Sequence, residues 1–159
     1  MDEVIEIERK FIVSKTPDET HQQYSRLGIC QWYEENAGGA IRHRRTYDWV
    51  GRGQPLYEKI IKKPSGHGSN IEKTLGRGKS TFWSGFYTHK KVSKTRLVYL
   101  ENGFKFEFDV FDPGYADFIL LEVELDHIDQ EINFPDWIKE LIIREVTGDS
   151  SYNNYNIAK

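Results

Sequence analysis

Apolar and polar residues alternate along much of this chain, with the period of two that is typical of β-strands. In residues 3–13 the apolar side chains fall mostly on odd positions, whereas the charged side chains of Glu6, Glu8 and Lys10 fall on even ones. The same alternation, interrupted by glycine, proline and asparagine turns, predicts further strands over residues 29–35, 40–49, 56–63, 69–75, 92–101, 103–112 and 118–126. Asn102-Gly103 is a typical hairpin turn between two of them.

The sequence contains fewer helix signals than strand signals. Thr16-Pro17-Asp18-Glu19 has the pattern of a capping box with proline at the first helical position, which predicts a helix up to about Leu27, stopped by Gly28. Ser80 is expected to cap a short helix that runs to about Phe86. A third is expected to begin at Asn133 or Asp136, to end at Gly148, and to bury Trp137, Ile138, Leu141, Ile142 and Val146. Residues 149–159 are predicted to form a docked coil.

The charged residues recur on one face of each predicted strand. The sets are Arg42 and Arg44; Glu58 and Lys62; Lys94 and Arg96; Lys105, Glu107 and Asp109; and Glu122 and Glu124. Such alternation fits an antiparallel sheet with one solvated face. It fits equally a sheet rolled so that the charged faces point inward, although burying each unpaired ion costs several kcal/mol. The pattern alone leaves both interpretations open.

Composition narrows the functional classes. The 159 residues include 22 basic and 25 acidic side chains, a net charge of −3, which argues against general binding to nucleic acid or anionic membranes. One domain over residues 1–159 is expected. The single cysteine, Cys30, excludes an internal disulfide. The chain lacks a basic, apolar leader and any apolar run of about 18 residues, so a soluble cytoplasmic protein is predicted.

The first charged strand suggests a chemistry. Glu6 and Glu8 stand two residues apart on one strand face, roughly 7 Å from each other. Carboxylate oxygens at such a spacing suit hard cations such as Mg²⁺, Mn²⁺ and Ca²⁺. Arginine and lysine on the other strands suit a multiply charged anion. A solvated strand face is the plain alternative for any one of these strands.

The ordered set of charged positions resembles the CYTH domain of the triphosphate tunnel metalloenzymes. The resemblance covers nearly the whole chain and rests on Glu6-x-Glu8-x-Lys10, Arg42-x-Arg44, Lys62, Lys94-x-Arg96, Glu107-x-Asp109 and Glu122-x-Glu124. The segment 145–154 also resembles the tail of small bacterial members. The resemblance implies an α+β protein: a closed eight-stranded antiparallel barrel with a charged interior and helices packed outside.

The same resemblance implies residue roles. A divalent metal, Mg²⁺ or Mn²⁺, would be held by carboxylates drawn from Glu6, Glu8, Glu122, Glu124, Glu72, Glu107 and Asp109. Phosphate oxygens would be held by Arg42, Arg44, Lys62, Lys94 and Arg96. Lys10 would contact phosphate or orient the attacking water, and the catalytic set would be Lys10, Glu6 and Glu8.

The implied activity is hydrolysis of inorganic triphosphate or a related triphosphate compound. A class IV-type adenylyl cyclase and a non-catalytic binder of nucleotides or polyphosphate are the alternatives. The expected partner is a small triphosphate such as inorganic triphosphate or ATP, with no membrane, no specific nucleic acid, and a monomer or homodimer. Residues 69–75 depart from the family pattern, in which an arginine is often followed by alternating glutamates, and the register of Lys62 against Lys63 is open.

Two other motifs are weaker. Gly76-Arg77-Gly78-Lys79-Ser80 ends like a phosphate-binding P-loop, but Lys73 stands where that motif needs its first glycine, and a flexible basic loop is predicted. The histidines show no metal-ligand spacing and are expected to be structural or exposed.

Overall fold

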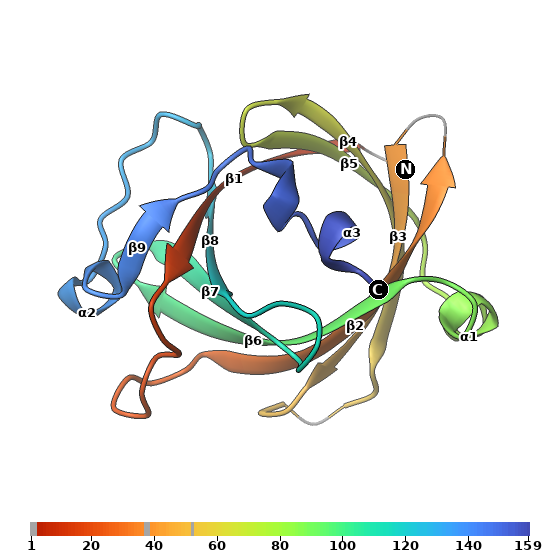
Figure 1. The fold of residues 1–159 in the computed structure, drawn as a ribbon, viewed down its shortest axis with the longest axis horizontal. Helices are drawn as coiled ribbons and strands as arrows, with labels where there is room; N and C mark the ends of the chain where they lie inside the picture. The colour runs from red at the N-terminus through yellow and green to blue at the C-terminus, as the bar shows by residue number, and fades with distance from the viewer. Residues whose placement is uncertain (1–2, 37–38, 52) are drawn as a thin grey trace.

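A computed structural model describes residues 3–36, 39–51 and 53–159, and within them eight strands form a closed antiparallel barrel. The order around the ring is β5-β4-β3-β2-β6-β7-β8-β1, and pairing of β1 with β5 closes it (Figure 1). The strands are β1 (Glu3–Val13), β2 (Ser25–Asn36), β3 (Gly39–Asp48), β4 (Leu56–Gly66), β5 (Ser69–Gly76), β6 (Lys91–Glu101), β7 (Phe104–Phe111) and β8 (Ile119–Leu125). The predicted barrel is confirmed, and the solvated open sheet is excluded.

The long first strand is what closes the ring. Its first half, from Glu3 to Ile7, pairs with β5, and its second half, from Ile7 to Val13, pairs with β8. A ninth strand, β9 (Ile142–Glu145), lies beyond the ring and pairs with the last residues of β1. Because β1 exchanges partners along its length, its charged face is shared by both halves of the barrel.

The predicted hairpin turn between β6 and β7 is confirmed. Asn102 and Gly103 have φ angles of 53° and 80°, the left-handed values that a two-residue turn of type I′ requires. This turn sets the register that places Arg96 opposite Asp109 across the two strands. The turn predicted at Asn36-Ala37-Gly38-Gly39 includes residues 37 and 38, which lie outside the described residues, but Asn36 and Gly39 on either side are paired.

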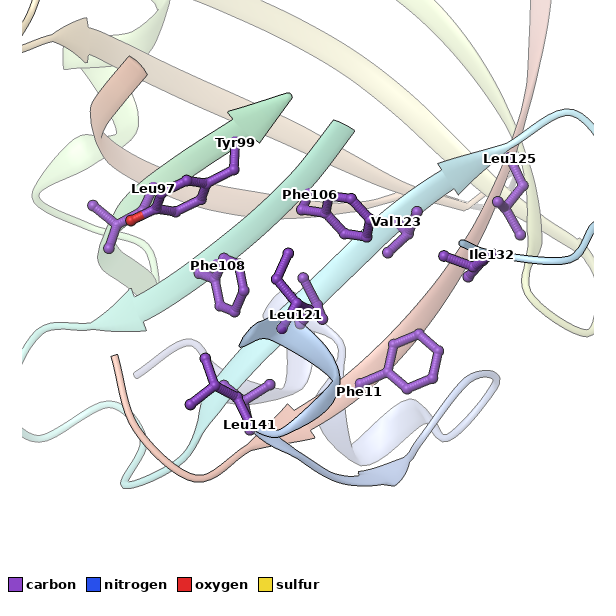
Figure 2. Close-up of a cluster of buried hydrophobic side chains, with 12 residues drawn as sticks. Phe11, Leu97, Tyr99, Phe106, Phe108, Leu121, Val123, Leu125, Ile132 and Leu141 are labelled. Carbon is purple, nitrogen blue, oxygen red and sulfur yellow. The ribbon is translucent and has the colours of Figure 1, made fainter. Parts of the chain in front are cut away.

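The outer face of one side of the barrel carries the main hydrophobic core, shown in Figure 2. Outward-facing residues of β1, β6, β7 and β8 meet the segment that follows β8, which contains α2 (Asp136–Lys139). The fully buried members include Phe106, Phe108, Leu121, Val123 and Ile138. Hydrophobic burial on this outer face leaves the alternate, inward positions of the same strands free for polar chemistry.

The helix α1 (Lys79–Phe86) packs outside the barrel, as predicted, although its N-cap is Gly78 rather than Ser80. The indole of Trp32 donates a hydrogen bond of 3.0 Å to the carbonyl of Phe82. A Cβ atom at Gly85 would stand 2.2 Å from the Trp32 ring, so glycine is required for this close packing. Among the described residues no helix is long and apolar enough to cross a membrane.

The helix predicted over residues 17–27 is wrong. Residues 14–24 form an irregular connection, in which the Asp18 carboxylate accepts a hydrogen bond from the backbone of Thr20. Residues from Ser25 onward join β2 and pair with β6. Gly28 does not stop a helix; a Cβ there would approach the Trp49 indole to 2.9 Å. The capping signal was local, and at the end of the segment the pairing of β2 with β6 outweighed it.

The helix predicted from residue 133 or 136 to Gly148 is also largely wrong. Only α2 is helical, and the apolar residues beyond it continue into β9, where Ile142 pairs with Val13. A free edge on β1 beyond its β5 pairing offers backbone hydrogen bonds that a helix would leave unused. The apolar spacing therefore described a buried face correctly but not its secondary structure.

The chain ends in a segment that we call the C-terminal tail, residues 149–159. It contains the 3₁₀ turn η1 (Ser150–Tyr152) and the short helix α3 (Asn154–Ile157), which Figure 1 shows within the outline of the ring. Ile157 and Ala158 pack with Ile12, Val92, Phe111 and Leu120, which point inward from four strands. The predicted docked coil is thus partly helical, and α3 fills one end of the interior, unlike the helices expected outside.

Candidate active site in the barrel interior

Strand alternation places the charged residues of most strands on the inner wall of the barrel. They line a cavity of about 530 Å³. Eleven of the thirteen predicted site residues lie on its wall: Glu6, Glu8, Lys10, Arg42, Arg44, Lys62, Glu72, Arg96, Glu107, Glu122 and Glu124. Lys94 and Asp109 do not line it, because both are fully buried behind the wall.

The acidic side of the cavity is built by β1 and β8. Their register sets Glu8 opposite Glu124, and Lys10 opposite Glu122. Burial and the neighbouring Glu122 carboxylate raise the pKa of Glu8 to about 8. Burial opposes ionisation of Glu122 too, but Lys10 and Arg96 outweigh it and lower the pKa of Glu122 to about 2. The repulsion between these carboxylates is the kind that a bound cation relieves.

Lys62 connects the acidic wall to the neighbouring strands. Its ammonium stands 2.8 Å from Oε1 of Glu6 and 3.4 Å from Oε1 of Glu72. Burial alone would raise the pKa of Glu6, but the charge of Lys62 lowers it. The β4–β5 register pairs Lys62 with Glu72, which answers the open question: Lys62, and not Lys63, faces the cavity.

The basic side is built by guanidinium groups. Arg42 and Arg44 come from β3 and Arg96 from β6. Burial, together with the charges of Arg42 and Arg96, lowers the pKa of Arg44 to about 10. Arg42 Nε is buried and donates no hydrogen bond within the described part of the chain. A buried guanidinium donor without an acceptor, beside two like charges, favours an anionic ligand.

Asp109 and Lys94 form a separate structural pair. Lys94 Nζ donates to Asp109 Oδ2 at 2.6 Å, while Arg96 donates to both carboxylate oxygens at 2.7 and 2.9 Å. These cations outweigh burial and hold the pKa of Asp109 well below its usual range. Burial lowers the pKa of Lys94 to about 8. With its oxygens occupied in this way, Asp109 orients Arg96 toward the cavity, and Glu107 braces the same guanidinium at 3.2 Å.

Several wall residues were not among the predicted site residues. They are Tyr33, Glu58, Asn70, Lys105 and the tail residues Asn153, Asn154, Tyr155 and Asn156. Glu58 and Lys105 share strand faces with predicted residues, so parity was a sufficient signal for them. Tyr33 follows the uncharged Ile29 and Gln31 on its strand face, where Glu35 alone is charged, and the tail has no periodicity, so the alternation of charges marked neither.

The acidic side chains are dispersed over the wall. Across residues 3–36, 39–51 and 53–159, no three acidic, histidine or cysteine side chains converge closely enough to hold a metal ion between them. Oε1 of Glu6 and of Glu72 are buried and accept no hydrogen bond of normal geometry from the described residues. Such a set fits a divalent cation held by one or two carboxylates together with oxygens of an anionic ligand.

Solved structures of other proteins resemble this chain in fold and in sequence. Two structures of NE1496, one described as a hypothetical protein and one as an inorganic triphosphatase, share 27% identity with this chain and superpose with a TM-score of 0.60. The alignments cover 96% of this chain and 96% and 93% of those chains. The resemblance to the triphosphate tunnel domains is thereby confirmed over nearly the whole chain.

A more distant structure is that of the putative adenylyl cyclase HpAC1 from Hippeastrum, described as having a dominant triphosphatase activity. It shares 14% identity, with a TM-score of 0.46, and the alignment covers 77% of this chain and 80% of that one. This similarity is too low to bear on fold or function. No protein-family model and no curated protein sequence matches the chain.

Proposed function

We propose that this protein hydrolyses inorganic triphosphate, or a related short triphosphate compound, inside its barrel with the help of Mg²⁺ or Mn²⁺. The observation that carries the proposal is one cavity with three guanidinium groups on one side and buried carboxylates on the other. Similarity to the inorganic triphosphatase NE1496 along almost the full chain supports it. A narrow polyanion would pair with the guanidinium groups, and a hard cation would pair with the carboxylates.

The basic side supplies charge neutralisation. Transfer of a phosphoryl group spreads negative charge over its oxygens, and catalysis rests mostly on positioning and electrostatic stabilisation. Arg42 has a buried Nε donor that finds no acceptor among the described residues, and Asp109 and Glu107 hold the Arg96 guanidinium in place. Because the Arg96 donors are fixed before the substrate arrives, little reorganisation of this group is needed during reaction.

The acidic side would hold the metal. Glu6, Glu8, Glu122 and Glu124, with Glu72 and Glu107 nearby on the wall, are the proposed carboxylates. A divalent cation supplies charge neutralisation on phosphate oxygens and lowers the pKa of a bound water. Since like-charge repulsion and burial keep a proton on Glu8 in its absence, metal binding and deprotonation of Glu8 are coupled.

Lys10 acts as a cation in this arrangement. Burial would lower the pKa of its ammonium, but the charge of the Glu122 carboxylate, its largest opposing influence, helps to raise it. Lys10 is therefore protonated at neutral pH and donates hydrogen bonds. We therefore expect Lys10 to contact a phosphate oxygen or the attacking water, and not to accept a proton.

The test is phosphate release by the purified protein from inorganic tripolyphosphate and from ATP, each with Mg²⁺, Mn²⁺ or a chelator. Metal-dependent release from tripolyphosphate is expected, and Glu6→Ala and Glu8→Ala each lower kcat by about 10²–10³-fold. Glu145→Ala, which removes an exposed carboxylate on the outer strand β9, is the matched control. Production of cyclic AMP from ATP, or tight binding without turnover, would contradict the proposal.

A further inference from the structure

The C-terminal tail forms one wall of the cavity. Its end is anchored, because the backbone amides of Lys91 and Lys159 each donate to the carbonyl of the other at 3.0 and 2.9 Å. Ile157 and Ala158 are buried in the apolar end of the barrel. This anchoring carries the four preceding residues, 153–156, to the cavity wall.

Two asparagines of the tail are bound by lysines of the barrel. Lys10 Nζ donates to Asn153 Oδ1 at 3.3 Å, and Lys94 Nζ donates to Asn154 Oδ1 at 3.1 Å. An ammonium group can only donate hydrogen bonds, so it fixes which end of each amide it meets. The oxygen of each side chain faces its lysine, and the NH₂ group is left for another partner.

Those two NH₂ groups donate no hydrogen bond to any group in the described part of the chain. The neighbouring Asn156 differs, because its Nδ2 donates to the carbonyl of Ser150 at 2.7 Å within the tail. Asn153 and Asn154 thus bring unused, oriented donors to a cavity whose wall also carries arginines.

We propose that Asn153 and Asn154 bind phosphate oxygens of the substrate. They would act as neutral hydrogen-bond donors that add to the basic anion-binding groups at the tail end of the cavity. This inference rests on the proposed triphosphatase function. It also gives Lys94 a role, since this fully buried cation does not line the cavity and acts through the Asn154 amide that it orients. Hydrogen bonds in such a chain polarise one another, which strengthens the outer donor.

Matched aspartate substitutions separate this role from a merely structural one. Asn154→Asp keeps an oxygen for Lys94 but replaces the NH₂ donor with a second oxygen, and it adds a negative charge. Because that charge repels a polyanion even without contact, Asn156→Asp is the charge control: Asn156 lies on the same wall, and its Nδ2 already donates within the tail. If Asn154 only tethers Lys94, the two aspartate variants weaken binding alike; if Asn154 binds phosphate, Asn154→Asp weakens it more.

The measurement is the Kd of inorganic tripolyphosphate by calorimetry, with Mg²⁺ and with chelator, beside kcat and KM. Removing a hydrogen bond to a charged group in Asn154→Ala is expected to raise Kd about tenfold, and Asn154→Asp by about a hundredfold. The tail control is Ser151→Ala, an exposed residue whose backbone rather than its hydroxyl bonds Asp149. Asn153→Asp, at an exposed position, is the second variant if Asn154→Asp does not fold.

The outcomes separate the two proposals. If the wild-type protein binds tripolyphosphate, and Asn153→Asp and Asn154→Asp raise Kd no more than Asn156→Asp does, the role of the asparagines is overturned and the triphosphatase function still stands. Wild-type protein that neither binds nor hydrolyses tripolyphosphate overturns the proposed function, and this inference with it.

Discussion

The two faces of strand β7 illustrate how this barrel divides its tasks. Phe106 and Phe108 point outward and are fully buried under the α2 segment, while Glu107 and Asp109, at the alternate positions, point inward. The outer face is stabilised by removal of apolar surface from water. The inner face keeps its charges because partners on adjacent strands neutralise them. Stability and chemistry therefore occupy opposite faces of one strand.

The inner face itself is not uniform. Asp109 is paired with two cations and closed off from the cavity. Glu8 lies on the cavity wall, and its one ion pair with a described residue is the 3.5 Å contact to Lys10. Complete pairing is typical of a structural ion network, and incomplete pairing leaves capacity for a ligand.

The largest effect is expected for Asp109→Ala, which breaks the division between the faces. It leaves Lys94 and Arg96 as buried cations without their main partner, so the free energy of unfolding is expected to fall by about 3–5 kcal/mol. Tripolyphosphate affinity is expected to fall as well, because Arg96 loses its orientation. Urea unfolding and calorimetry measure both. A variant that lost activity while keeping its full stability would point to Asp109 as a metal ligand instead.

Phe108→Ala tests the outer face alone. Truncation of this fully buried ring is expected to lower the free energy of unfolding by about 3–5 kcal/mol. The activity of the folded fraction at low temperature should match that of wild type, since the ring points away from the cavity. Loss of substrate affinity in the folded variant would show that the two faces are not independent.

Glu8→Gln tests the inner face through the pH dependence of the free energy of unfolding. Between its ordinary pKa of 4.5 and its raised pKa of about 8, folded Glu8 keeps a proton that the unfolded chain releases. In metal-free buffer, wild-type stability should therefore fall as the pH rises from 5 toward 7.5. Glutamine carries no titrating proton, so this part of the slope should vanish in the variant. Parallel stability–pH curves from denaturant unfolding would contradict the raised pKa.

The smallest effect is expected at the barrel exterior. Arg9 and Glu145 form a two-point ion pair, at 2.8 and 2.7 Å, that joins β1 to β9 near solvent. Glu145→Ala is expected to lower the free energy of unfolding by about 0–1 kcal/mol, as is typical of exposed pairs. Activity should not change. A cost as large as that of Asp109→Ala would mean that β9 is needed to hold the barrel closed.

The sequence by itself determined which side chains share a face. Strand parity is local, so Glu6, Glu8 and Lys10 on β1 and Glu122 and Glu124 on β8 were identified as sets before any strand was placed. The barrel strands and the β6–β7 turn followed from the same local signals, because alternation and turn chemistry act over a few residues.

The tertiary structure decided which partner each charge meets. Register and closure place Asp109 between Lys94 and Arg96, and leave Arg42 Nε without an acceptor among the described residues. They also place residues 142–145, which were expected to be helical, in strand β9, and they bring Asn153 and Asn154 to the cavity. These outcomes depend on contacts between residues far apart in the chain, and a local pattern contains no information about such contacts.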